Sequence, residues 1–92
     1  MKRYLVERDI PEIGSMSGAQ LRDIAAISND ALTKLAGKVQ WVQSFVGADK
    51  TFCIYLAGSE ELVCEHSRLA GFPVTRVTEV ARVLDTMTPY TD

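Results

Sequence analysis

The sequence predicts an α+β domain whose elements follow in the order strand, helix, strand, strand, helix, strand. Two segments, residues 17–37 and 59–71, have apolar side chains at helical spacing. Between them lie two segments rich in β-branched and aromatic residues, and one further strand-like segment lies at each end. Such a split pattern folds as an antiparallel four-stranded sheet with both helices on one face.

Residues 2–8 form the first predicted strand, because their apolar centre ends in charged residues and then in a loop with proline and glycine. Ser17 stands as the N-cap of the first helix, and Gln20 three positions later completes the pattern of a capping box. Apolar residues continue at helical spacing until Gly37, where we expect the helix to end.

Residues 39–46 and 51–57 are expected to pair as a β-hairpin, because residues 47–50 between them have turn chemistry. Strict alternation gives each strand two faces, and apolar side chains occupy both. In the first strand these faces are Val39, Trp41 and Phe45 against Val42 and Val46; in the second they are Phe52, Ile54 and Leu56 against Cys53 and Tyr55. Two helices cover only one face of a sheet, so we expect a homodimer that forms through the open face.

Ser59 is the expected N-cap of the second helix. Glu60 and Glu61 lie in its first turn, where the helix dipole favours anions. Gly71, followed by Pro73, indicates where this helix ends.

The last strand is expected over residues 76–84, where side chains alternate, and residues 85–92 are expected to form a polar tail. The completed order is that of the ferredoxin-like fold. No stretch rich in Pro, Gly or Ser is long enough to act as a linker, so residues 1–92 are expected to form one domain. A domain of this size has a modest core, which association would stabilise.

Charge and hydropathy argue against two classes of partner. Ten Lys and Arg oppose twelve Asp and Glu, for a formal charge of -2, and the basic residues are dispersed, which argues against nucleic acid. The uncharged runs fall well short of the roughly 20 apolar residues that cross a membrane. Charges soon after Met1 interrupt any signal-peptide core. We therefore expect a cytoplasmic protein. Cys53 and Cys64 lack a C-x-x-C spacing and would lie in a reducing compartment, so we expect free thiols.

His66, the only histidine, lies on the second predicted helix at a position that should face the sheet. A half-buried histidine that is hydrogen-bonded to one strand side chain would explain it without a functional role. The alternative is a metal site shared with Glu7 and Cys53, because Cys and His suit nickel, copper or zinc better than magnesium or calcium. Without a metal, the ordinary interpretation is that Glu7 is a solvated charge at the end of a strand and that Cys53 is a packing residue. Cys64 diverges from His66 by about 200° around the helix, so the two do not form a chelate.

The aromatic residues Tyr4, Trp41 and Tyr55 could line a small ligand pocket, in which we also place Gln43. Packing in the core or in an interface is the alternative. The sequence contains no G-x-S-x-G, P-loop, H-E-x-x-H or glycine-rich dinucleotide motif, and one histidine cannot supply both a base and its orienting partner. Familiar hydrolase and kinase mechanisms are therefore not supported.

Five stretches resemble, in order and at matching spacing, a family of small bacterial domains whose best-described type is a nickel-binding protein with a ferredoxin-like fold. They are residues 4–9 (YLVERD), 41–46 (WVQSFV), 49–55 (DKTFCIY), 65–66 (EH) and 70–73 (AGFP). The resemblance implies a homodimer that binds nickel or another divalent transition metal, with His66, Glu7 and Cys53 as candidate ligands. At Gln43 the family commonly has histidine, and an amide oxygen is a poorer ligand for nickel than an imidazole nitrogen.

Three functions remain open from the sequence. The first is a homodimeric binding protein that holds a metal ion or a small ligand between the sheet and the second helix. The second is a small enzyme, such as a monooxygenase or isomerase, by analogy with other dimeric ferredoxin-like domains. Its cavity would be lined by Trp41 and Tyr55, with Glu7 or His66 as acid or base. The third is an interaction module that has no pocket.

Overall fold

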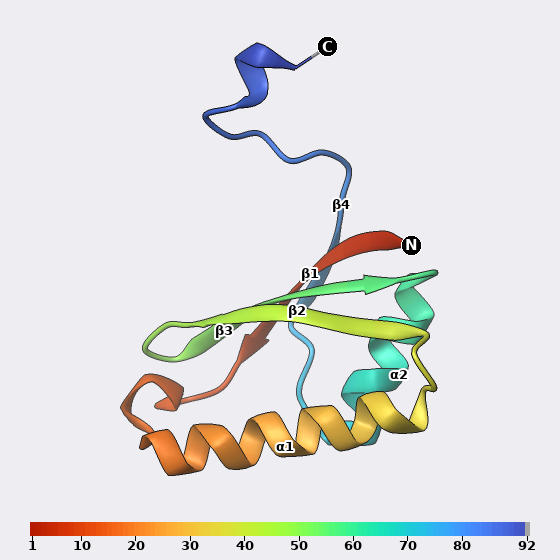
Figure 1. Ribbon diagram of the computed structural model, residues 1–92. Coiled ribbons are helices and arrows are strands. Elements are labelled where there is room, and N and C mark those ends of the chain that lie inside the picture. The colour runs from red at the N-terminus through yellow and green to blue at the C-terminus, as the bar shows by residue number, and fades with distance from the viewer. Residues whose placement is uncertain (92) are drawn as a thin grey trace.

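A four-stranded antiparallel sheet with two helices on one of its faces forms the protein (Figure 1). The computed structural model describes residues 1–91, and the last residue of the predicted tail lies outside them. The strands are β1 (Lys2–Asp9), β2 (Val39–Val46), β3 (Lys50–Ala57) and β4 (Arg76–Val80), and the helices are α1 (Gly18–Lys34) and α2 (Glu60–Ala70). The order across the sheet is β2-β3-β1-β4, so the predicted ferredoxin-like fold is confirmed.

The two helices begin at the residues that the sequence indicates. The Ser17 hydroxyl accepts a hydrogen bond from the Gln20 backbone N–H at 3.2 Å, and the Gln20 side chain accepts one from the Ser17 N–H at 2.9 Å. The Ser59 hydroxyl accepts from the Leu62 N–H at 3.4 Å. Gly71 ends α2 with a φ of 76°, a left-handed conformation that glycine adopts without a steric penalty.

Alternation along β1 decides which side chains face the helices. Tyr4, Val6 and Arg8 are buried beneath the helices, whereas Leu5 and Glu7 lie on the opposite, open face. The core on the helix side consists of Tyr4, Val6, Val39, Cys53, Tyr55, Ala57 and Val63. Arg8 therefore occupies a position that continues a row of buried side chains.

The strict alternation predicted for β2 is wrong after Trp41. Trp41 lies opposite Tyr55, but Gln43 lies opposite Ile54, so a β-bulge takes up Val42. Phe45 is consequently opposite Phe52 on the open face. Val46, opposite Thr51, turns to the helix side instead.

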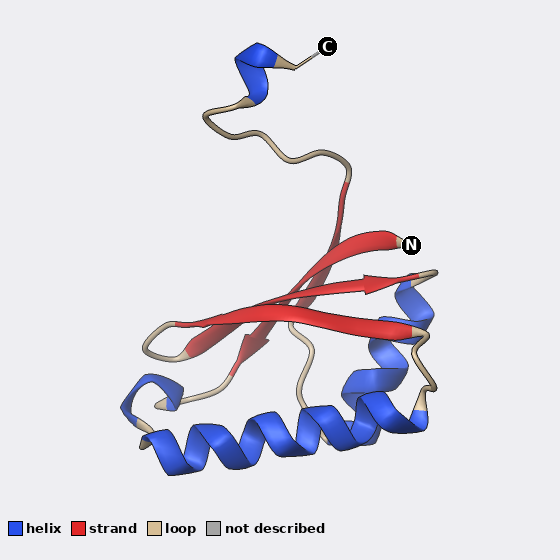
Figure 2. Ribbon diagram, in the orientation of Figure 1, coloured by secondary structure: helices blue, strands red, loops and turns tan. Residues whose placement is uncertain are grey.

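The last strand is shorter than predicted and ends at Val80 rather than at residue 84. Val80 lies opposite Arg3, and β1 begins at Lys2, one residue earlier. Residues 81–84 therefore have almost no strand residues left to pair with. The chain then leaves the sheet, and the tail, with the short 3-10 helix η2 (Thr88–Tyr90), stands away from the body of the protein (Figure 2). Exposed apolar side chains along it include Leu84, Met87 and Tyr90.

The face of the sheet that the helices leave open is largely apolar. Leu5, Phe45, Phe52, Ile54 and Leu56 lie on this face. Phe45 is 54% exposed. Within residues 1–91, no helix is long and apolar enough to span a bilayer.

Candidate functional site

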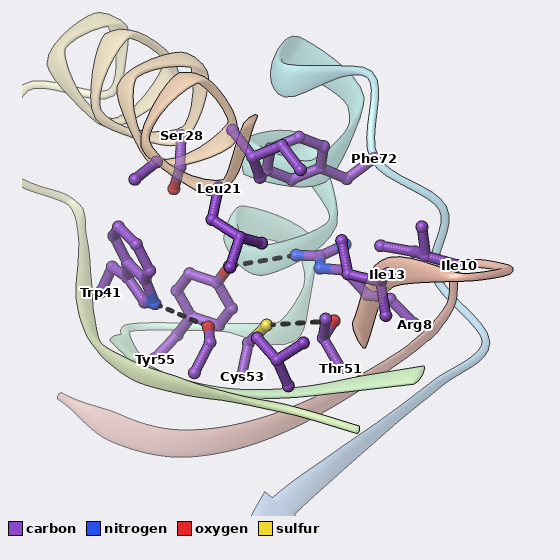
Figure 3. A pocket seen from close by; sticks show the side chains of 14 residues that line it. Arg8, Ile10, Ile13, Leu21, Ser28, Trp41, Thr51, Cys53, Tyr55 and Phe72 are labelled. Atoms are coloured by element: carbon purple, nitrogen blue, oxygen red, sulfur yellow. Dashed lines mark hydrogen bonds between the residues drawn. The ribbon is translucent and has the colours of Figure 1, made fainter. Parts of the chain in front are cut away.

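A cavity of about 210 Å³ lies between α1 and the helix side of the sheet, and we call it the helix-side cavity (Figure 3). It is lined by Arg8, Ile10, Ile13, Leu21, Ile24, Ala25, Ser28, Trp41, Ser44, Val46, Thr51, Cys53, Tyr55 and Phe72. Most of these side chains are apolar, and no Asp or Glu is among them. The surface they form suits an apolar ligand with one polar end.

Each wall of the helix-side cavity follows from a periodicity in the sequence. Leu21, Ile24, Ala25 and Ser28 lie at the i, i+3, i+4 and i+7 positions of α1 and share one face of the helix. The floor comes from one residue of β1, from alternate residues of β3 and from helix-side residues of β2, which are Arg8; Thr51, Cys53 and Tyr55; and Trp41, Ser44 and Val46. The wall and the floor are therefore set by regular structure, which holds their side chains in place.

The third wall is the loop after β1, which contains the short 3-10 helix η1 (Ile13–Ser15). The loop is held against the β2–β3 turn by backbone hydrogen bonds from Ile10 N–H to the Asp49 carbonyl at 3.0 Å and from Gly14 N–H to the Ala48 carbonyl at 2.9 Å. A Cβ on Gly14 would lie 2.5 Å from the Gly47 carbonyl oxygen, so only glycine allows this approach. Ile13 is thereby fixed over the cavity and is almost fully buried.

Among residues 1–91, Arg8 is the one charged side chain that lines the helix-side cavity, and it is only 2% exposed. Its Nη1 donates to the Ser67 hydroxyl at 3.0 Å and to the Pro73 carbonyl at 2.8 Å, and its Nη2 donates to the Tyr55 hydroxyl at 3.1 Å. Its Nε has no hydrogen-bond partner in the part of the chain that the structure describes. Arg8 forms no salt bridge with any carboxylate of the described residues. A buried cation that is held only by neutral acceptors is uncommon, because burial of a charge is costly unless an opposite charge offsets it.

Two aromatic side chains and a thiol complete the polar part of the cavity. Burial raises the pKa of Tyr55 to about 12, while the nearby Arg8 charge acts in the opposite direction. Tyr55 is therefore a neutral phenol at physiological pH. Trp41 donates from its indole N–H to the Ser44 hydroxyl at 2.9 Å, and the Cys53 thiol donates to the Thr51 hydroxyl at 3.6 Å.

His66 is fully buried on α2, next to the cavity but not among its lining residues. Its Nε2 lies 3.2 Å from the Ser28 hydroxyl and 3.3 Å from the Ser28 carbonyl oxygen. The predicted hydrogen bond to a strand side chain is therefore replaced by one to α1. Burial lowers the pKa of His66, the Arg8 charge lowers it further, and the backbone hydrogen bond to Ser28 raises it.

The three candidate metal ligands do not meet in one chain. Cys53 faces the helices, whereas Glu7 lies on the open face and its carboxylate is 3.5 Å from Lys50 Nζ. Glu7 is paired with Phe52 and shares its face, whereas Cys53, the next residue of β3, points to the other face. The sheet therefore separates Glu7 from both Cys53 and His66. In the part of the chain that the structure describes, no group of three His, Cys, Asp or Glu side chains is placed to hold a metal ion.

Two of the four predicted pocket residues, Trp41 and Tyr55, line the helix-side cavity. Tyr4 is in the core but does not reach the cavity, and the bulge places Gln43 on the open face. Sequence reasoning missed Arg8, although it lies two residues after Val6 and four after Tyr4 and therefore in phase with both. A charged residue in phase with buried apolar residues is the signal that could have revealed it.

The fold and this geometry define a small ferredoxin-like domain with a ligand-sized cavity around a buried arginine. Residues 4–80 match the family described as nickel responsive protein SCO4226-like, so the chain belongs to this family. The resemblance found in the sequence is thereby confirmed.

One solved structure supports the fold independently. The crystal structure of SCO4226 from Streptomyces coelicolor A3(2) matches with a TM-score of 0.74 and 14% sequence identity, over 89% of this chain and 99% of that one. At this level of identity the likeness shows the fold alone. A search of curated proteins found no match.

Proposed function

We propose that this chain is a homodimeric binding protein that holds a small organic ligand in the helix-side cavity. The observation that carries this proposal is the cavity itself, with a volume of about 210 Å³ and a mainly apolar lining. A dry, apolar cavity of about 150 Å³ is already large enough to bind benzene. A compact ligand with an aromatic or short aliphatic body therefore suits its size.

Binding is better supported than catalysis. The enzymatic alternative requires Glu7 or His66 to act as an acid or base within the cavity, and neither side chain lines it. Glu7 is on the opposite face of the sheet, and the Nε2 of His66 is engaged by Ser28. A general acid or base must come within hydrogen-bond reach of the proton that it transfers.

The dimer belongs to the same proposal. The open face, defined by Leu5, Phe45, Phe52, Ile54 and Leu56, is covered by neither helix. A second copy would present an identical apolar surface, as a two-fold interface requires. We also propose the cytoplasm as the location, because Cys53 and Cys64 are free and free thiols persist in reducing compartments.

Nickel binding is a second candidate function, and the family description favours it. The Cys and His donors of the chain are of the type that nickel accepts. The described part of a single chain does not fit a nickel site, however, because the sheet separates Glu7 from Cys53 and His66 and no three donors meet. Glu7 and Gln43 lie on the open face, where a second copy would add its own Glu7 and Gln43 as oxygen donors. We therefore propose that any nickel site requires two copies of the chain.

The cavity proposal can be tested with a neutral apolar probe, benzyl alcohol, in an NMR titration of uniformly 15N-labelled protein. Trp41 is the only tryptophan and lines the cavity, so its indole N–H signal reports occupancy directly. Ala25→Phe should fill the cavity and abolish the shift. Ala26→Phe, at an exposed neighbouring position of α1, is the matched control and should retain the shift. A Trp41 signal that is unmoved by millimolar benzyl alcohol would refute cavity binding.

The nickel proposal can be tested by isothermal titration of metal-stripped protein with nickel and with zinc. Glu7→Gln should weaken binding, whereas Glu79→Gln, an exposed glutamate of β4, should not. A variant that disrupts the open face should lose binding as well. Absence of nickel binding by the intact protein would remove this second function and leave the cavity proposal unaffected.

A further inference from the structure

The guanidinium of Arg8 has unused N–H hydrogen-bond donors on one edge. An arginine has five N–H groups, and Arg8 uses three of them for Ser67, Pro73 and Tyr55. The two that remain are the Nε–H and the second N–H of Nη2. These two nitrogens share one edge of the planar group, and this edge forms parallel hydrogen bonds with the two oxygens of a carboxylate.

The described residues around Arg8 supply no negative charge to offset its own. No Asp or Glu lines the helix-side cavity, and Arg8 makes no salt bridge within residues 1–91. Tyr55 stays a neutral phenol because its pKa is about 12. In a medium of low dielectric constant, the electrostatic attraction between an anionic group and an unpaired cation is stronger than it is in water.

The position of Arg8 is also held from several sides, so the cation is preorganised. Its guanidinium carbon lies 5.3 Å from the Phe72 ring centroid and 5.8 Å from the Tyr55 ring centroid. The hydrogen bonds to Ser67 and Pro73 attach it to α2 and to the segment after it. A cation that is already oriented loses little entropy when a ligand binds.

We propose that the ligand of the helix-side cavity is an organic monocarboxylate whose carboxylate pairs with the Nε and Nη2 edge of Arg8. The inference rests on the cavity being the binding site proposed above. The size of the cavity favours an apolar body of about six to nine carbon atoms. Leu21, Ile24 and Trp41 would contact this body, and a phosphate ester fits less well because the described residues place no second cation in the cavity lining.

The test compares phenylacetate with its neutral isostere phenylacetamide in NMR titrations of the full chain at pH 7. Phenylacetate should bind at least about 10-fold more tightly. In Arg8→Met this preference should disappear while phenylacetamide still binds, which also shows that the variant is folded. Arg8→Lys keeps the charge but loses the planar edge, and it should recover only part of the preference.

Each remaining outcome decides a different question. Equal affinity for phenylacetate and phenylacetamide in the wild-type protein would overturn the carboxylate assignment and leave the cavity proposal standing. Inorganic phosphate that displaces phenylacetate at equal concentration would overturn the assignment as well. Failure of phenylacetate, phenylacetamide and benzyl alcohol alike to move the Trp41 signal would refute the binding function itself.

Discussion

The imidazole Nε2 of His66 on α2 lies 3.2 Å from the hydroxyl and 3.3 Å from the carbonyl oxygen of Ser28 on α1. A carbonyl oxygen only accepts hydrogen bonds, so the contact places the proton of the neutral ring on Nε2. Nδ1 is left as a buried acceptor without a partner among the described residues. The pair joins the two helices beside the helix-side cavity, because Ser28 also lines it.

Stability should therefore fall in mild acid. Burial lowers the pKa of His66 in the folded protein, whereas in the unfolded chain it is close to its ordinary value of about 6.5. Below that pH the unfolded state binds the proton more readily than the folded state. The free energy of unfolding therefore has its full value above about pH 6.5. It decreases as the pH falls from there towards the pKa of His66 in the folded protein.

Urea denaturation at pH 7.5 and pH 5.5 measures this difference, and His66→Gln is the informative variant. Its stability should be lower at pH 7.5 but should change less between the two pH values. His66 is the only histidine, so no other imidazole contributes to the slope. A pH dependence of equal size in both proteins would contradict the assignment to His66.

Tyr55→Phe should destabilise the protein by about 1–3 kcal/mol, because it removes the acceptor of one Arg8 hydrogen bond inside the core. The distance from Arg8 Nη2 to the Tyr55 oxygen is 3.1 Å, and Tyr55 is 1% exposed. The control is Tyr90→Phe on the exposed tail, which should change stability by less than about 0.5 kcal/mol. Thermal denaturation of the three proteins gives the comparison, and equal stability of Tyr55→Phe and the wild type would show that the hydroxyl contributes nothing.

Gly14→Ala should destabilise the protein by about 1–3 kcal/mol and also weaken benzyl alcohol binding. The new Cβ would lie 2.5 Å from the Gly47 carbonyl oxygen and 2.9 Å from the Ala48 Cα, so the loop that carries Ile13 must move. Gly18→Ala is the matched control, because the nearest atom to its new Cβ is the flexible end of Arg22 at 3.4 Å. This control should be neutral or stabilising by less than about 1 kcal/mol. Two variants of equal stability and affinity would show that the loop does not shape the cavity.

The elements that local chemistry determines could be predicted from the sequence. Ser17 with Gln20 and Ser59 with Gly71 define helix ends through hydrogen bonds and backbone conformations within a few residues. Capping residues and apolar spacing therefore located both helices and gave the order of the elements along the chain. The predicted pocket residues Trp41 and Tyr55 do line the cavity, because they are paired with each other on the helix side of the hairpin.

The features that were missed depend on partners that are distant in the sequence. The bulge at Val42 arises from the pairing of β2 with β3, and it moves Gln43 and Phe45 to the open face. The role of Arg8 depends on Ser67 and Pro73, which are 59 and 65 residues away. No local pattern specifies either relationship, so the site differed from its prediction more than the fold did.

The last prediction concerns the open face, where Ile54 lies opposite Leu5 of β1 and Gln43 of β2. If two copies associate through this face, sedimentation velocity should show a dimer for the wild-type protein. Ile54→Lys should then give a monomer, because a charge buried without a partner at the centre of an interface costs several kcal/mol. The substitution leaves the helix-side core untouched.

Ile27→Lys is the matched control, since Ile27 is 46% exposed on α1, on the side of the sheet away from the open face. It makes the same chemical change, so loss of the dimer in Ile54→Lys alone would locate the interface on the open face. A dimer that survives Ile54→Lys but not Ile27→Lys would place the interface on α1 instead. In that case the proposed nickel site between two open faces would be excluded by the same measurement, because Glu7 would no longer face a second copy.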